Sequence, residues 1–370
     1  VESIKNKKTS AILKYSSQGK EDRDSFLKCR WVVGCDGAHS LVRSTMQSEL
    51  QDLGLHQKWM VIDVLMSNRS EANKILPKHS VQYCDPERPM TACFISKNRR
   101  RFEMMLKEDE VETELVSSKN VWDILSKWIT PNDAKIERVA VYTYHAMIAE
   151  DWHDGALMLA GDSAHQSPPF LGQGMCSGIR DAASLGWRLV FVSEKCASNK
   201  LFDSYSSERK PHVRRFIDVA IECGKIIQEE DLNSAKQRDR EFARIGGKTF
   251  SFPNPQIGEG VRIDNDAPVG TISTQKKFAD GSFLDDKIGN EFTVLVQKIG
   301  YLNFNSKLNE LLARWSIRVI ECDGEVLEWL EMLNYFAIIL RPDKYIFGVA
   351  RLSNDVEELI YAVNAKLTES

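Results

Sequence analysis

Short runs in which apolar and polar residues alternate dominate roughly the first 150 positions of the chain. The alternation predicts strands at Ser10–Tyr15 and Phe26–Val33, with a polar, glycine-containing loop at 16–24 between them. The other predicted strands of this part are Trp59–Val64, Ser80–Cys84, Thr91–Ile95, Arg101–Leu106 and Arg138–Tyr144. One helix-like stretch, Val121–Trp128, interrupts these strands before Pro131. The pattern indicates a β-sheet layer covered by a helix.

From residue 156 the pattern changes to helical spacing. Ala156–Ala160 is a buried strand in this interpretation, followed by long helices at about Gly172–Glu194 and Leu201–Glu230. The apolar positions at three- and four-residue spacing in the first helix are Met175, Ile179, Ala182, Ala183, Trp187, Val190 and Phe191. Next come a charged segment, Glu229–Arg244, expected to be a linker or an exposed helix end, and a stretch rich in Gly and Pro, Gly246–Gly270. The last hundred residues alternate strand and helix, which predicts a separate small α/β domain.

Composition removes several classes of function. A net charge of -4 argues against a nucleic-acid partner, and the longest apolar runs, such as Phe336–Leu340, are too short to span a membrane. The eight cysteines form no CxxC pair and no zinc-like cluster with histidine, so we predict no metal site. Their scatter suits buried thiols in a reducing cytosol, and no signal peptide is visible, so we expect a cytoplasmic protein.

The first candidate for chemistry is the segment Gly34–Arg43. An apolar strand ends in Gly-Cys-Asp-Gly, and Ser40 is placed to cap the helix that follows. Glycine allows close backbone approach, a helix N-terminus offers N–H groups to a phosphate, and Asp36 can accept from ribose hydroxyls. Asp36, Gly37 and Arg43 are therefore candidate cofactor residues. A plain tight turn is an equally good explanation of this segment alone.

A second segment, Leu157–Met175, is more specific. A hydrophobic strand delivers Gly161 and Asp162 at its carboxyl end, where α/β folds bind ligands. Pro168 and Pro169 stiffen the loop, and Gly172-Gln173-Gly174 lets the backbone approach a flat ring before the helix. The positive end of that helix would stabilise negative charge on a reduced ring system. A corner made only of turn residues is the weaker interpretation.

Together the two segments resemble the later FAD motifs of FAD-dependent aromatic-ring hydroxylases, the single-component flavoprotein monooxygenases. The run Pro168–Ala182 is similar to that of 3-(3-hydroxyphenyl)propionate and phenol hydroxylases. Supporting segments are Trp59–Asp63, Cys84–Pro89, Phe202–Pro211 and, in the tail, Arg341–Tyr345. The likeness covers about residues 1 to 230 well and the remainder more loosely.

The resemblance implies an α/β fold with four parts. These are a partial, Rossmann-like FAD-binding domain (1–52), an inserted α+β substrate sheet (53–146), the FAD-binding domain continued (147–235) and a thioredoxin-like C-terminal domain (243–370). Because the last domain has no CxxC, a thiol-redox role is not expected.

The resemblance also implies a reaction. NAD(P)H would reduce FAD, and the reduced flavin with O2 would form a C4a-hydroperoxide that hydroxylates a small phenolic substrate. Asp162 would hold ribityl or ribose hydroxyls, and Asp36 and Arg43 would lie near the pyrophosphate and the nicotinamide approach. Pro168 and the backbone of Gly172, Gln173, Gly174 and Met175 would face the isoalloxazine. Self-association into a homodimer is one option.

One departure from the family is the missing GxGxxG unit, which grips the ADP half of FAD. We therefore expect a piece of a longer enzyme, with open edges on its parallel strands, or a gene product that has lost catalysis and acts as a binding or interaction protein. On this view the 370-residue chain retains little flavin after desalting. A nicotinamide-only dehydrogenase fits less well, because no dinucleotide fingerprint is present.

Weaker signals have ordinary explanations beside functional ones. His165 is a possible proton relay, although a role in stabilising its loop is favoured. Tyr83, Tyr142 and His145 could contact a phenol hydroxyl, but packing is favoured for each. The basic run Lys97–Arg101 could attract an anionic substrate or the NADPH phosphate, but a solvated turn is favoured. Trp187 and Phe191 are predicted core residues.

Overall fold

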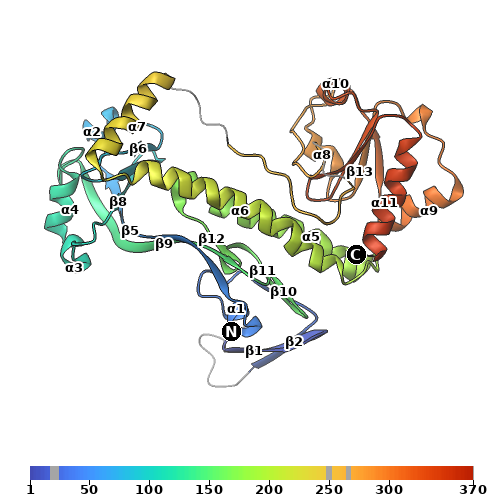
Figure 1. Cartoon of the computed structure of the whole chain (residues 1–370), viewed down its shortest axis with the longest axis horizontal. Coiled ribbons are helices and arrows are strands. Elements are labelled where there is room, and N and C mark those ends of the chain that lie inside the picture. The colour runs from blue at the N-terminus through green and yellow to red at the C-terminus, as the bar shows by residue number, and fades with distance from the viewer. Residues whose placement is uncertain (17–24, 247–251, 264–267, 370) are drawn as a thin grey trace.

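Two small sheets form the N-terminal part of this computed structural model, which describes residues 1–16, 25–246, 252–263 and 268–369 (Figure 1). Strands β1 (Ser3–Lys7), β2 (Ser10–Tyr15) and β3 (Ser25–Cys29) make an antiparallel sheet. Strand β4 (Val32–Gly34) pairs in parallel with β11 (Leu157–Leu159), which pairs with the short β10 (His153–Asp154). The predicted strand Phe26–Val33 is therefore wrong as one element, because its two ends join different sheets. Most of the predicted loop 16–24 lies outside the described residues.

The β4–β11 pair carries the two sequence motifs. The short helix α1 (Leu41–Met46) follows β4, and the parallel pairing aligns Gly34 with Leu159, so both strands end at the same edge. Within the described residues β4 has a hydrogen-bonded neighbour on one side only. Its other edge is open, as the sequence led us to expect for the parallel strands.

A six-stranded antiparallel sheet forms the second part, in the order β12-β9-β5-β8-β7-β6. Its strands are β5 (Leu50–Met66), β6 (Val81–Tyr83), β7 (Met90–Ser96), β8 (Arg99–Met105), β9 (Ala134–Ala149) and β12 (His165–Gln166). Met60, Ile62 and Val64 of β5 lie on one face and pack in one core with Val121 and Leu125 of α4 (Ser118–Leu125). The short helix α2 (Ala72–Ile75) lies between β5 and β6 in the chain, and α3 (Glu112–Leu115) lies between β8 and α4. The predicted sheet with a covering helix is confirmed.

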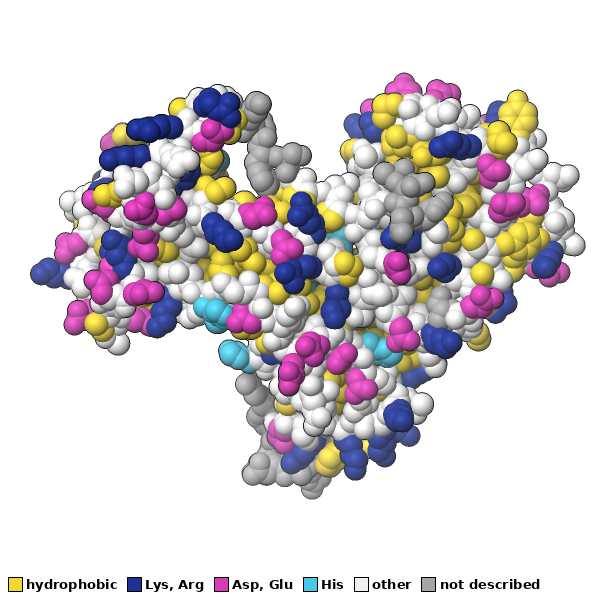
Figure 2. Space-filling model, in the orientation of Figure 1, with side chains coloured by type: hydrophobic (Ala, Val, Ile, Leu, Met, Phe, Trp, Pro, Cys, Tyr) yellow, Lys and Arg dark blue, Asp and Glu magenta, His cyan; other side chains and the backbone are white. Residues whose placement is uncertain are grey.

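Two long helices cross the middle of the molecule, α5 (Gly174–Glu194) and α6 (Leu201–Ile227) (Figure 1). The charged segment after them is a true helix, α7 (Leu232–Ile245), whose N-terminus is capped by the Asp231 side chain. In Figure 2 the surface is hollowed between the lobe that carries α7 and the C-terminal part, with positive and negative side chains interspersed.

The C-terminal part is a small α/β unit, as predicted. Its sheet has the order β14-β13-β15-β16, in which β13 is parallel to β14 and antiparallel to β15. The elements are α8 (Leu284–Ile288), β13 (Thr293–Val296), η3 (Ile299–Tyr301), α9 (Ser306–Trp315), β14 (Arg318–Glu321), α10 (Gly324–Met332), β15 (Ala337–Leu340), β16 (Ile346–Ala350) and α11 (Asp355–Glu369). This order is compatible with the thioredoxin-like expectation, which stays a prediction.

The core is continuous between α5 and the C-terminal unit. Trp187 and Phe191 are almost fully buried and meet Phe292 edge to face at 5.7 Å between ring centroids. The core prediction for these two residues is confirmed. The other side of the same helix is open, because Met175 and Ile179 are 77% and 60% exposed.

The expectation of buried thiols is wrong for most cysteines. Only Cys322 is buried, Cys35 and Cys196 are exposed, and the others are intermediate. Most cysteines lie in turns or on partly covered faces, which spacing along the chain does not reveal. None of them forms a disulfide. Within the described residues no helix combines the length and the apolar character that a membrane crossing needs.

Candidate functional site

The turn after β4 is built by its own side chains. Ser40 caps α1 by accepting from the backbone N–H of Arg43 at 2.9 Å, as predicted. Asp36 accepts from the Ser40 hydroxyl at 2.5 Å and from the Val42 N–H at 3.1 Å. Burial works to raise the pKa of Asp36, but these hydrogen bonds lower it below the usual value. Asp36 therefore shapes the turn, beside an open groove of about 460 Å³ along β4.

Arg43 connects the two sequence motifs. It is 9% exposed, and its guanidinium donates to the carbonyl oxygens of Ser163 at 2.8 Å and Ala38 at 2.6 Å. Both motifs are thereby fixed to each other across 120 residues of sequence. The geometry gives Arg43 a role in joining the two turns, whereas its assignment to the cofactor stays a prediction.

The corner segment, Ala160–Gly178, begins at the end of β11. Gly161 has φ 64°, which favours glycine, and starts the turn η1 (Gly161–Ser163). Asp162 is exposed, and no other described residue is hydrogen-bonded to its carboxylate. The loop then passes through β12 and η2 (Pro169–Leu171) into α5. A free carboxylate thus stands at the end of a buried strand.

The backbone at the start of α5 borders open space. A Cβ added at Gly172 or Gly174 would meet no heavy atom within 4 Å. Gly172 adopts φ 64°, and Gln173 provides no side-chain cap for the 21-residue helix. The first N–H groups of α5 therefore lie beside a surface that a flat, electron-rich ring can approach. Pro168 is buried against this loop, while the Met175 side chain points into solvent.

A buried carboxylate on α5, Asp181, forms hydrogen bonds with the corner segment. Asp181 is fully buried and accepts from the Gly161 N–H at 3.0 Å, the His165 Nε2 at 2.6 Å and the Arg209 Nε at 2.9 Å. Burial alone would raise the pKa of Asp181, but His165, Arg209 and the Gly161 N–H lower it to about 2. A sequence cannot identify this cluster, because its members come from four elements, η1, β12, α5 and α6.

His165, the possible proton relay, lies inside this cluster. Its side chain is 1% exposed and stacks near Trp152, with 5.5 Å between ring centroids. Its Nδ1 has no hydrogen-bond partner among the described residues. The favoured interpretation, a loop-stabilising histidine, agrees with the Asp181 contact and with the lack of solvent access.

An aromatic cluster lies where the six-stranded sheet meets the corner segment. Phe170 packs edge to face on Trp59 at 5.5 Å and on Tyr144 at 6.3 Å between centroids. Gly224 of α6 lets this happen, because a Cβ there would come within 2.8 Å of the Phe170 ring. The Trp59 indole N–H is buried and has no hydrogen-bond partner among the described residues, and burial raises the pKa of Tyr144. Sequence analysis missed Phe170 and Tyr144 as site candidates, although an aromatic after Pro168-Pro169 was a usable signal.

Of the other aromatic candidates of the sheet, Tyr142 lies beside this cluster as the cross-strand partner of Trp59, whereas Tyr83 lies away from it. Tyr83 is on the opposite face and packs on Trp128 at 5.7 Å. The Tyr142 hydroxyl accepts from Arg138, and one His145 ring nitrogen lies 2.8 Å from His56 Nδ1. The geometry agrees with the packing interpretation for Tyr83, whereas Tyr142 and His145 make polar side-chain contacts.

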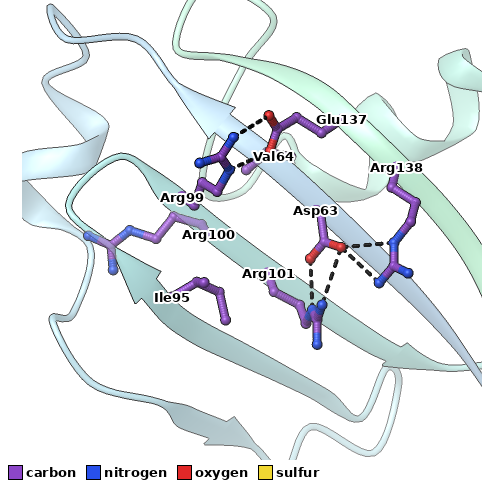
Figure 3. A pocket seen from close by; sticks show the side chains of 8 residues that line it. All are labelled: Asp63, Val64, Ile95, Arg99, Arg100, Arg101, Glu137 and Arg138. Carbon is purple, nitrogen blue, oxygen red and sulfur yellow. Dashed lines mark hydrogen bonds and ion pairs between the residues drawn. The ribbon is translucent and has the colours of Figure 1, made fainter.

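The basic run lines a pocket of about 210 Å³ in which several charges are already paired (Figure 3). Arg101 and Arg138 both bind the Asp63 carboxylate, and Arg99 binds Glu137 at 2.9 Å. Two carboxylates therefore form ion pairs with three guanidiniums on this face. The solvated-turn interpretation holds for Lys97 and Asn98, which are exposed in a turn. It is wrong for Arg99–Arg101, which lie in β8, where Arg100 is 4% exposed.

A second buried group, His212, extends the cluster behind the corner segment. Its Nδ1 lies 2.7 Å from an Arg209 nitrogen. Burial, then the charges of Arg209 and Arg180, lower the pKa of His212 to about 2. The side chain is therefore neutral in the folded state at any ordinary pH.

This neutrality predicts a pH dependence of stability. Above pH 6.5 the imidazole is uncharged in both states and contributes nothing, but below pH 6.5 only the unfolded chain takes up the proton. The free energy of unfolding should therefore fall by up to about 1.4 kcal/mol per pH unit between roughly pH 6.5 and 4. Urea unfolding of the chain and of His212→Gln at pH 7.5, 6 and 4.5 measures it, since the variant lacks this loss. Parallel pH profiles for the two proteins would contradict the assignment.

Comparison with known proteins gives a consistent picture. A family described as "FAD binding domain" matches residues 2–220, more than half of the chain. A probable NADH-specific resorcinol 4-hydroxylase of Rhodococcus jostii is 33% identical over 91% of this chain and 67% of its own length. A 3-(3-hydroxy-phenyl)propionate/3-hydroxycinnamic acid hydroxylase of Mycolicibacterium gilvum is 33% identical over 91% of this chain and 66% of its own. The chain spans about two thirds of the length of these curated relatives.

Solved structures share the fold at lower identity. Aklavinone-11 hydroxylase in complex with FAD and aklavinone superimposes with a TM-score of 0.76 at 16% identity, over 98% of this chain and 71% of that one. The rebeccamycin enzyme RebC, soaked with K252c, gives a TM-score of 0.79 at 16% identity, over 99% of this chain and 73% of that one. The mixed α/β architecture with several sheets is therefore confirmed as that of FAD-dependent hydroxylases.

Proposed function

The chain belongs to the FAD-binding-domain family of flavoprotein aromatic hydroxylases, and from this premise we propose that its corner segment holds FAD for the hydroxylation of a phenolic compound with NAD(P)H and O2. The observation that carries the proposal is the combination of a free Asp162 carboxylate and an open glycine backbone at the N-terminus of α5. The relatives named for resorcinol and hydroxyphenylpropionate support a phenolic substrate.

The residues at the corner fit the cofactor. The Asp162 carboxylate would accept hydrogen bonds from sugar-chain hydroxyls, and the backbone from Gly172 to Gly174 would lie against the ring without steric obstruction. The N–H groups of the first turn of α5 would stabilise negative charge on the ring. Asp36, Gly37 and Arg43 form the neighbouring turn toward the phosphates. Bound FAD supplies hydride acceptance from NAD(P)H and activation of O2.

The substrate would lie on the face of the sheet that carries Trp59 and Tyr144. Contact with the partly exposed rings of Tyr144 and Phe170, which pack on the buried Trp59, would exclude water from the reacting atoms. The buried Trp59 N–H has no acceptor among the described residues, so a phenolic oxygen that reached it would meet an unpaired donor. The protein's own contribution is therefore orientation and a dry surface, with no nucleophile required.

The reaction itself tests the proposal. The chain is supplied with FAD and with NADH or NADPH, and phenol, resorcinol and 3-(3-hydroxyphenyl)propionate are added in turn. We expect one of these compounds to stimulate NAD(P)H oxidation and to gain one oxygen atom, identified by mass spectrometry. Oxidation that no phenol stimulates, with no hydroxylated product, would favour the alternative of a binding protein without catalysis.

Replacement of Asp162 by alanine should weaken FAD binding. No described residue forms a hydrogen bond or an ion pair with this carboxylate, so the hydrogen bonds to the cofactor are the ones expected to be lost. A charge-assisted hydrogen bond corresponds to roughly tenfold to a hundredfold in the dissociation constant. Titration followed by flavin fluorescence measures the constant, with Asp203→Ala as control because that carboxylate is exposed on α6. Equal affinities for the two variants would remove Asp162 from the site.

A further inference from the structure

A buried chain of hydrogen bonds runs from the C-terminal unit to the corner segment. The Tyr345 hydroxyl lies 3.2 Å from His212 Nε2, and His212 Nδ1 lies 2.7 Å from Arg209. Arg209 donates through Nε to Asp181, which accepts from the Gly161 N–H. Tyr345, His212, Arg209 and Asp181 are each 2% exposed or less. The contacts therefore operate without competition from water.

The hydrogen-bonded chain of Tyr345, His212, Arg209 and Asp181 is the relay. The donors and acceptors that these side chains offer set the direction of each of its bonds. Arginine can only donate, so His212 Nδ1 must accept from Arg209. The neutral imidazole then carries its proton on Nε2, which donates to the Tyr345 oxygen. Burial raises the pKa of Tyr345, so the phenol stays protonated and uncharged. Only one tautomer of His212 satisfies both neighbours, and its Nε2–H finds its acceptor in the Tyr345 oxygen.

At the other end, the relay fixes the residue next to the proposed cofactor ligand. Asp181 binds the N–H of Gly161, which precedes Asp162 and has the left-handed backbone of the turn. A carboxylate that moved by a few tenths of an ångström would loosen this N–H and with it the turn. Because Arg209 holds the second oxygen of Asp181, the position of the turn depends on where Arg209 is held.

The C-terminal unit is itself locked to the same helix. Glu208, the neighbour of Arg209 on α6, binds Arg341 at 2.8 Å and Arg188 at 2.6 Å. Asp343 binds Arg341 at 2.6 Å, and all four side chains are at most 1% exposed. The segment 341–345 thus contacts α6 twice, through the ion pair of Arg341 with Glu208 and through the hydrogen bond of Tyr345 with His212. A displaced C-terminal unit would release both contacts together.

We propose that the C-terminal unit sets the geometry of the corner segment through Tyr345, His212, Arg209 and Asp181, which act as positioning residues for the turn at Gly161–Asp162. The inference rests on the proposed function only for its consequence, which is a change in the affinity for FAD. The geometric part concerns the chain without bound FAD. It assigns to the C-terminal unit a role in the cofactor site, although none of its residues reaches that site.

Hydrogen exchange in the 370-residue chain without added flavin tests the geometric part. Tyr345→Phe removes one hydroxyl and leaves the ring, so we expect the Gly161 amide, in peptides spanning 157–166, to exchange roughly three to ten times faster. Tyr361→Phe is the matched control, since this tyrosine packs partly buried on α11 outside the relay. No acceleration at Gly161, or an acceleration no greater than in the control, would overturn the inference.

A pair of variants at His212 separates positioning from mere packing. Gln can accept through its oxygen and donate through its nitrogen, whereas Leu can do neither. We expect His212→Leu to accelerate Gly161 exchange and weaken FAD binding about tenfold, and His212→Gln to restore at least half of the protection. Identical behaviour of the two variants would overturn the relay. Failure of the unmodified chain to bind FAD would count against the proposed function alone, because the exchange result does not need the cofactor.

Discussion

Asp181→Ala should lower the free energy of unfolding by about 3–5 kcal/mol, the cost of breaking a buried ion pair from one side. The substitution leaves the Arg209 guanidinium fully buried without its carboxylate. It also leaves the Gly161 N–H and the His165 Nε2 without their acceptor. Each unsatisfied buried group adds a penalty, so the loss should be among the largest of any single substitution outside the hydrophobic core.

Urea unfolding followed by tryptophan fluorescence measures the loss. Asp218→Ala is a matched control, since Asp218 is a partly exposed carboxylate on α6 paired with Arg214 four residues away. Pairs of that kind are worth about 0.3–0.5 kcal/mol. A loss below about 1 kcal/mol for Asp181→Ala would mean that the cluster behind the corner segment does not form as described. Should Asp181→Ala fail to fold, Asp181→Asn, which keeps the shape and removes the charge, gives the same comparison.

Arg341→Met should destabilise the contact between the C-terminal unit and α6 by about 3–5 kcal/mol. Arg341 is the cation that Glu208 and Asp343 share, and all three side chains are buried. Methionine fills much of the space but leaves two carboxylates facing each other, with only Arg188 to compensate. The guanidinium also donates to the Val261 carbonyl at 3.0 Å, and that bond is lost too.

The same unfolding measurement, together with hydrogen exchange of α6, reports this loss. Arg314→Met on α9 is the control, because that guanidinium is exposed and lies over the Trp315 ring. We expect faster exchange in the middle of α6, around Glu208, in Arg341→Met only. Unchanged exchange there, with a stability equal to that of the control, would show that the buried ion network does not attach the C-terminal unit.

The elements near the site could be predicted from the sequence because their signals are local. Ser40 as a cap, the strand before Gly161 and the helix after Gly174 each follow from a few neighbouring residues. The same local logic made Phe26–Val33 one strand, since nothing in that stretch says that its ends pair with different sheets.

The contacts that organise the site could not be predicted from spacing. Arg43 is hydrogen-bonded to Ser163, 120 residues away in sequence, and Asp181 to Arg209, 28 residues away. Asp36 and Arg43 were expected to face a cofactor, yet much of their hydrogen-bonding capacity is used within the protein. Buried polar residues of this kind are identified only when the fold brings their partners together.

The most direct test of the account is hydrogen exchange of the chain during titration with FAD. The account predicts that saturating FAD protects peptides from Gly34–Arg43 and from Ala160–Gly178, and that Asp162→Ala shifts this protection to higher FAD concentration. Peptides of the C-terminal surface, such as those around Met332, should not change. Exchange in Ala160–Gly178 that stays the same at every FAD concentration would contradict the claim that this corner holds the flavin.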